Sequence, residues 1–150
     1  IGYAPRSPEI LRDLDSVKIA VGSGSSAWLR MNRVSPHFGG SGVFTTVHDW
    51  LKWDRNWTSH QLAGKEFTTL MHSRMKFDHP KDNDAFGLVF GEYGGRSRIW
   101  FSGADLDASA YVARFPDQRL TVCCFSNNPA GQSEQHVASL LDVLVSAGML

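Results

Sequence analysis

The strongest periodic pattern in the sequence lies near its C-terminal end. After Ser133 and Glu134, apolar residues recur at helical spacing, at Val137, Leu140, Leu141, Leu144 and Val145. A stripe of this kind lets a helix bury one face against another element, and the polar residues before it are typical of a helix start. The pattern predicts a C-terminal helix that lies across a sheet.

A second helix is predicted after the glycine-rich run at residues 38–42. Thr45 or Thr46 supplies a hydroxyl that can cap a helix from Val47 to about Trp57. Helical spacing places one inward stripe on this helix, formed by Val47, Trp50, Leu51 and Asp54. We interpret the stripe as core packing interrupted by one acid.

A third helix is predicted from Lys65 to Met75, because the Asp-His-Pro run at 78–80 cannot continue it. One side of this helix carries Phe67, Leu70, Met71 and Arg74. Polar residues follow through Asp84 and predict a loop.

Beyond this loop the pattern changes to short strand-like runs, at residues 86–93, 98–101, 108–115 and 120–125. Gly94-Gly95 and the Pro-Asp-Gln run at 116–118 are typical of tight turns, so three of these runs are expected to form an antiparallel meander. The last run is apolar on both faces. We therefore expect a strand covered on each side rather than one at an edge.

Before the helices, residues 17–21 and 27–32 predict a hairpin joined by the Gly/Ser-rich stretch 22–26. The whole order predicts the α+β class, with an antiparallel sheet flanked by helices. We expect a single partial domain, in which 1–37 is a hairpin and loop region, 38–84 is helical, and 85–150 holds the strands and the closing helix.

Composition narrows the function classes. The chain of 150 residues is 42% hydrophobic and 11% aromatic, which is enough for a buried core. Fifteen basic residues balance fifteen acidic residues, so no net charge favours nucleic acid as a partner. No apolar run approaches the roughly 20 residues of a membrane span. The kind of partner must therefore be inferred from a binding or catalytic site, because composition does not indicate it.

Metal, phosphate and disulfide chemistry have no sequence support. Cys123 and Cys124 are adjacent in a strand-like run, where neighbouring side chains point to opposite faces, so they are not expected to bond each other. The six histidines form no ligand pair with metal-site spacing. No phosphate-binding glycine loop is present. We expect no cofactor and no metal.

Five local signatures, in order, are similar to the serine β-lactamase-like family, which includes class C β-lactamases, related esterases and D-amino-acid peptidases. They are the glycine-rich turn and helix start at 39–50, the strand at 85–90, the Phe-Ser-Gly-Ala box at 101–104, and the strands at 110–116 and 122–127. The resemblance covers residues 38–150. It implies the C-terminal part of the β-lactamase/transpeptidase-like fold, in which an active site lies between the sheet and a helical region.

The resemblance also implies a serine hydrolase that transfers an acyl group from an ester, amide or β-lactam to water. In such proteins a Ser-x-x-Lys motif supplies the nucleophile and a Tyr-x-Asn or Ser-x-Asn motif assists it, because an unassisted hydroxyl is a weak nucleophile at neutral pH. Both motifs are expected before Ile1, so this chain alone is predicted to be inactive. The family occurs in periplasmic, secreted and cytoplasmic proteins, and the sequence does not select among them.

Phe101, Ser102, Gly103 and Ala104 occupy the position of the family's third box, which implies one wall of the substrate site. There the Ala104 N–H can face an oxyanion, whereas Phe101 replaces a polar residue and can neither donate a hydrogen bond nor carry charge. An active parent protein is then expected to favour uncharged esters or amides. An alternative interpretation is a strand that ends in an acidic turn at Asp105 and Asp107.

Two short matches are interpreted as accidental. Ser73 and Lys76 spell Ser-x-x-Lys, but they follow the glycine-rich turn, whereas the family's nucleophile precedes it. Such four-residue matches arise easily by chance. The Ser-Asn-Asn run at 126–128 spells Ser-x-Asn where a strand is expected to end, so a turn is the favoured role.

Two functions therefore remain open. The chain is either part of a serine hydrolase or a catalytically inactive module whose cleft binds a ligand or partner. Loss of the family's first strands and helix exposes a sheet edge and an apolar face. We therefore expect a homodimer, strand exchange or association with the missing segment, and a monomer in light scattering at micromolar concentration would contradict this.

Overall fold

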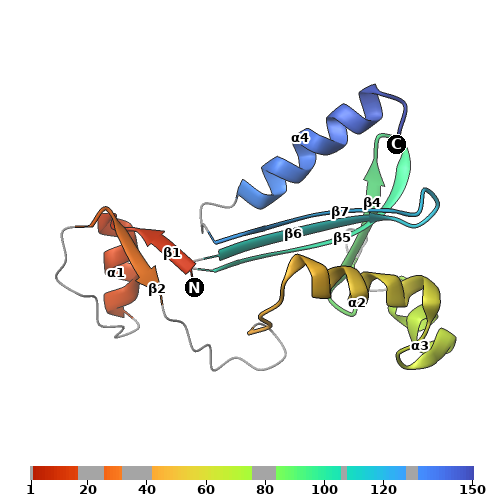
Figure 1. Ribbon diagram of the computed structural model, residues 1–150, viewed down its shortest axis with the longest axis horizontal. Coiled ribbons are helices and arrows are strands. Elements are labelled where there is room, and N and C mark those ends of the chain that lie inside the picture. Colours follow the sequence, from red (N-terminus) through yellow and green to blue (C-terminus); the bar gives the residue numbers. More distant parts are fainter. Residues whose placement is uncertain (1, 17–25, 32–41, 76–83, 106–107, 128–131) are drawn as a thin grey trace.

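The computed structural model describes residues 2–16, 26–31, 42–75, 84–105, 108–127 and 132–150. They form an α+β fold in which helices flank an antiparallel sheet, as the sequence predicted (Figure 1). The larger sheet has the strand order β3-β4-β5-β6-β7, and a separate two-stranded sheet pairs β1 with β2.

The predicted antiparallel meander is confirmed, but it is larger than predicted, with five described strands in one sheet and a strand at 96–105 where 98–101 was expected. Its strands are β3 (Asp84–Ala85), β4 (Leu88–Tyr93), β5 (Arg96–Asp105), β6 (Ala108–Phe115) and β7 (Leu120–Ser126). Each pairs antiparallel with the next. The β4–β5 turn uses Gly94 and Gly95, both with positive φ, as expected for a two-residue hairpin turn.

The register divides the sheet residues between two faces. Trp100 pairs with Ala113, which pairs with Val122, while Phe101 pairs with Val112, which pairs with Cys123. Successive side chains point to opposite faces of a sheet. The row with Trp100 therefore faces α4, and the row with Phe101 faces the layer that contains α2. Figure 1 shows α4 on one side of the sheet and α2 and α3 on the opposite side.

The predicted C-terminal helix is α4 (Gln132–Ser146), which packs on β6 and β7. Val137 and Leu141 are buried, whereas Leu140 is exposed, so the buried stripe is narrower than predicted. This layer holds the main core, which comprises Tyr111, Ala113, Phe115, Val122, Val137, Leu141 and Leu150.

The prediction for β7 was partly wrong. Both faces are covered, because Val122 packs in the α4 core and Phe125 contacts Trp50 of the opposite layer. Within the described residues, however, β7 ends the strand order and pairs only with β6. Apolar residues on both faces indicate layers above and below a strand, and they do not indicate how many strands flank it.

The two helices of the opposite layer are α2 (Val47–Ser59) and α3 (Gly64–Met71). The predicted start of α2 is confirmed, but its inward stripe was wrong in part, since Val47 and Leu51 are exposed. Trp50 and Asp54 of the predicted stripe do meet the sheet, and Trp57 joins them there.

The predicted end of α3 was wrong. The helix stops at Met71 rather than Met75, because the Ser73 amide turns back to the Leu70 carbonyl, a 3.0 Å contact that closes the last turn. The side of α3 that faces inward also differs from the prediction, since Leu70 is exposed while Thr68 is buried.

The N-terminal region contains β1 (Gly2–Pro5), α1 (Pro8–Ser16) and β2 (Trp28–Met31), which share a small core of Ala4, Leu14 and Leu29. Of the predicted hairpin, residues 17–21 lie outside the described residues, and the strand at 28–31 pairs with β1. The helix α1 was not predicted from the sequence. Its signal was Ser7 before Pro8, and the Ser7 hydroxyl accepts from the Ile10 amide at 3.3 Å.

Candidate functional site

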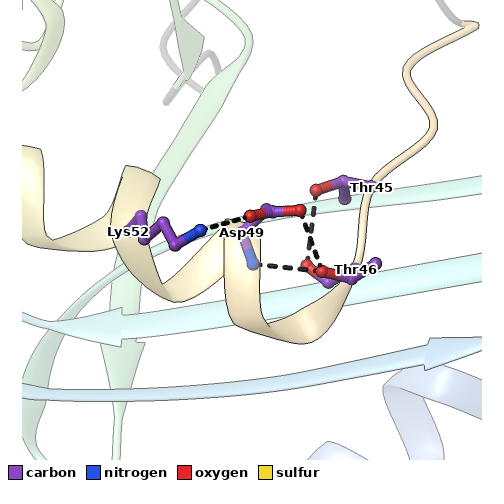
Figure 2. Close-up of polar contacts among 4 residues, drawn as sticks. All are labelled: Thr45, Thr46, Asp49 and Lys52. Atoms are coloured by element: carbon purple, nitrogen blue, oxygen red, sulfur yellow. Dashed lines mark hydrogen bonds and ion pairs between the residues drawn. The ribbon is translucent and has the colours of Figure 1, made fainter.

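The start of α2 is fixed by Thr46, in agreement with the predicted cap. The Thr46 hydroxyl accepts from the Asp49 amide at 3.2 Å and donates to the Asp49 carboxylate at 3.1 Å (Figure 2). Thr45 donates to the Thr46 carbonyl instead. This reciprocal arrangement satisfies a helix-terminal amide that has no partner within the helix.

The Asp49 carboxylate also pairs with Lys52 at 2.7 Å (Figure 2). The hydrogen bond from Lys52, together with that from Thr46, lowers the pKa of Asp49 below its ordinary value of 3.8. A lowered carboxylate pKa means that this contribution to stability is present above the ordinary value and is lost as pH falls through the lowered one.

The middle of α2 is held to the sheet by Arg114 of β6. Its Nη2 donates to the Asp54 carbonyl at 3.1 Å, and its Nη1 lies 3.4 Å from Asp54 Oδ1. Thr121 of β7 contacts both carboxylate oxygens of Asp54, at 3.1 and 3.2 Å. Burial lowers the pKa of Arg114 and the neighbouring Asp54 opposes that shift, so an arginine in this position remains a cation.

A cavity of about 220 Å³ lies between α2, the end of α3 and the sheet. Aromatic and aliphatic side chains dominate its lining, which consists of Trp50, Trp53, Asp54, Trp57, Met71, His72, Gly87, Leu88, Ile99, Phe101, Val112 and Arg114. A concave, mainly apolar site with a few polar groups is the usual form of a small-molecule pocket. The cavity is therefore the first candidate for ligand binding.

Ring contacts hold the aromatic walls of the cavity in place. Trp50 lies 5.4 Å from Phe101 and 5.8 Å from Phe125, measured between ring centroids. Trp53 meets Trp57 edge to face at 5.8 Å. Offset and edge-to-face contacts of this kind stabilise aromatic pairs beyond the area they bury, so the walls are formed before any ligand arrives.

His72 follows the last residue of α3 and stacks on Trp57 with ring centroids 4.3 Å apart. Burial is the largest effect on this ring and lowers its pKa below the ordinary value of 6.5; Arg114 adds to the shift and Asp54 opposes it. His72 is therefore neutral at neutral pH, and the cavity gains no net charge from it.

The four residues predicted to form one wall of the substrate site do not share one environment. Phe101 lines the cavity and is half-buried against Trp50, whereas Ser102, Gly103 and Ala104 are exposed. These three residues pair with β6 on one side only, and no strand of the described part pairs with their other side. The box thus combines an apolar residue in the cavity with an exposed strand edge.

The short motif at Ser73 and Lys76 does not form a helical Ser-x-x-Lys pair. Since α3 ends at Met71, Ser73 lies beyond the helix, and its hydroxyl donates to the Leu70 carbonyl at 2.6 Å. Lys76 lies outside the described residues. Ser126 ends β7 and Asn127 follows it as an exposed residue, as expected for the end of a strand.

One hydroxyl–imidazole contact was not predicted. Thr68 Oγ1 lies 2.6 Å from His60 Nδ1 and 3.0 Å from the Lys65 carbonyl. Thr68 is only 1% exposed, so a substrate cannot reach its hydroxyl. The contact joins the end of α2 to α3, which is a structural role.

Cys123 and Cys124 are free thiols on opposite faces of β7, as predicted. Burial, with a smaller effect of Asp54, raises the pKa of Cys123. A raised pKa keeps the sulfur protonated, and the thiol form is a poor nucleophile. We therefore assign Cys123 to packing.

Comparisons of the chain with protein-family models, curated proteins and solved structures find no match. No helix in the described part of the chain is long and apolar enough to cross a membrane. Over the same residues, no group of three or more His, Cys, Asp or Glu side chains is placed to hold a metal ion.

Proposed function

We propose that the chain is the C-terminal part of a β-lactamase-like serine hydrolase and supplies one wall of its acyl-transfer site. The observation that carries this proposal is the exposed outer side of Ser102, Gly103 and Ala104 in β5, next to Phe101. In this proposal the Ser-x-x-Lys nucleophile and its assisting motif come from sequence before Ile1.

An exposed strand edge suits this role for a physical reason. Backbone amides that are not paired within a sheet can donate to a substrate carbonyl or to the oxyanion that forms from it. Gly103 has open space where a Cβ would stand, so a ligand can approach the backbone closely. The sheet order and the helices on both faces are compatible with the proposal without being specific to it.

Phe101 bears on the substrate class. A phenyl ring at the first position of the box packs against apolar groups and offers no charge to a carboxylate. The proposed substrates are therefore uncharged esters or amides, and substrates that depend on recognition of a carboxylate are expected to react poorly.

The test compares two proteins, the present chain and a longer form of it that includes the sequence upstream of Ile1. A fluorophosphonate probe is expected to label a serine in the extended protein and none in the present chain, including Ser73. Ala104→Pro removes one backbone donor and is expected to lower kcat about 100-fold or more, whereas Ala104→Gly retains the N–H and should change kcat little.

A second function is favoured by the replacement of a polar box residue with Phe101. In that case the protein is a catalytically inactive module that binds a ligand. A folded extended protein that neither reacts with fluorophosphonate nor hydrolyses a chromogenic ester would support this function and would exclude the hydrolase.

A further inference from the structure

The cavity between α2, α3 and the sheet is large enough for a ring-sized molecule. Its volume is about 220 Å³, and engineered apolar cavities of about 150 Å³ already admit benzene. A single substituted ring or a fused bicyclic ring therefore fits without expansion of the layers. Trp53, which is 38% exposed, and the exposed Gly87 place one side of the lining at the solvent.

The two charged groups of the lining form an ion pair, and three buried nitrogens of lining residues have no hydrogen-bond partner in the described part of the chain, namely Arg114 Nη1, Trp50 Nε1 and His72 Nε2. Asp54 and Arg114 pair with each other, and Thr121 contacts the Asp54 carboxylate as well. A charged ligand would have to lose its hydration without gaining a free counter-charge, and burial of an unpaired charge is costly. An uncharged ligand avoids this penalty.

The lining also favours a flat ring over other apolar shapes. Trp50, Trp53, Trp57 and Phe101 supply aromatic surface on the α2 side and on the sheet side of the cavity. Their mutual contacts, and the stacking of His72 on Trp57, fix these rings in advance. Preformed walls reduce the ordering cost of binding, and aromatic faces and edges add attraction for a ring.

We propose that this cavity is a binding site for a small uncharged aromatic molecule of one ring or two fused rings. The proposal goes beyond acyl transfer and does not depend on it, because it concerns the interior between α2 and the sheet rather than the exposed edge of β5.

The test compares two probes of nearly equal size, 4-fluorotoluene and 4-fluorobenzoate, by fluorine NMR with the purified chain. 4-Fluorotoluene is expected to show a saturable shift, and the carboxylate analogue is expected to bind at least about tenfold more weakly. No saturable shift with 4-fluorotoluene, or equal affinity for the two probes, would overturn the proposal.

Location is tested in two ways. Met71→Trp and Ile99→Phe each add volume inside the cavity and are expected to weaken binding of 4-fluorotoluene more than about tenfold. Val143→Phe on the exposed side of α4 adds volume outside the cavity and should leave binding unchanged. In the unsubstituted protein, nuclear Overhauser contacts should join the probe to the methyl groups of Ile99 and Val112. Contacts only to α4 residues, or full binding by both filled variants, would overturn the assignment.

Discussion

Arg114 contacts both the backbone and the side chain of Asp54. One guanidinium nitrogen donates to the Asp54 backbone carbonyl at 3.1 Å, and another lies 3.4 Å from the Asp54 carboxylate. One side chain of β6 thus anchors both the backbone and a side chain of α2. The pair has low exposure, 13% for the Arg114 side chain and 17% for that of Asp54. This anchor forms one wall of the cavity.

Arg114→Met is therefore expected to lower the free energy of unfolding by on the order of 3 kcal/mol, because it leaves a mostly buried carboxylate without its cation. The measurement is urea denaturation at neutral pH. Arg96→Met, at an exposed arginine of β5, is the control and should stay within about 0.5 kcal/mol of the unsubstituted protein. Equal losses in the two variants would contradict an anchoring role. Adding Asp54→Leu to Arg114→Met should recover part of the loss, since no unpaired charge then remains.

Thr46 and Thr45 provide a matched pair at the start of α2. Thr46→Ala removes the hydroxyl that accepts from the Asp49 amide, and the expected cost is about 1 kcal/mol. Thr45→Ala removes a hydroxyl that only donates to the Thr46 carbonyl, so its cost should be less than half as large. Urea denaturation of both variants checks this, and the reverse order would show that Thr46 is not the cap.

The lowered pKa of His72 predicts a dependence of stability on pH. In the unfolded chain this ring binds a proton near its ordinary pKa of 6.5, whereas the folded protein binds it only at lower pH. Stability is therefore greatest above 6.5 and falls as pH drops toward the lowered folded pKa. Unfolding free energies at about pH 7.5 and about pH 5.5 should differ in this direction. His72→Phe keeps a ring against Trp57 and removes the titration, so a difference of the same size in this variant would refute the assignment.

Gly94 and Gly95 in the β4–β5 turn test two separate effects. Both have positive φ, so alanine at either position is strained by about 1 kcal/mol. A Cβ at Gly94 would also stand 2.7 Å from Val145 Cγ2 of α4, whereas a Cβ at Gly95 meets nothing within 4 Å. Gly94→Ala should therefore cost about 1–3 kcal/mol more than Gly95→Ala in thermal or urea unfolding.

The additional cost of Gly94→Ala should shrink when Val145 is also changed to alanine, because the clashing methyl group is then absent. Equal effects of Gly94→Ala in the two backgrounds would show that backbone strain alone accounts for the loss. This comparison tests whether the turn is packed against α4.

Several parts of the fold were predictable because their signals are local. The two-residue turn at Gly94-Gly95 is encoded by the freedom of glycine to adopt positive φ. A capping hydroxyl at Thr45 or Thr46 indicated the start of α2, and the structure shows that Thr46 is the cap. The strand at 108–115 agrees with β6 residue for residue. The helix α1 had a comparable local signal in Ser7-Pro8, which is a capping signal and not a hydrophobic periodicity.

The candidate site was less predictable. The box at 101–104 was identified through a resemblance, but the sequence did not indicate that Phe101 would face a cavity while Ser102 and Ala104 remain exposed. Periodicity oriented α2 correctly only in part, since Trp50 and Asp54 face the sheet as predicted while Val47 and Leu51 are exposed. Arg114, which is 60 residues from Asp54 along the chain, holds the Asp54 carbonyl and carboxylate against the sheet.

The sequence by itself determined the class of fold, the meander and the amphipathic C-terminal helix, because turns, caps and periodicity act between residues that are near one another in the chain. Only the tertiary structure decided that Val47 and Leu51 of α2 remain exposed, where α3 ends, and that three tryptophans and Phe101 line one cavity. Those outcomes depend on contacts between distant elements, whose energies outweigh the small local preferences of each segment.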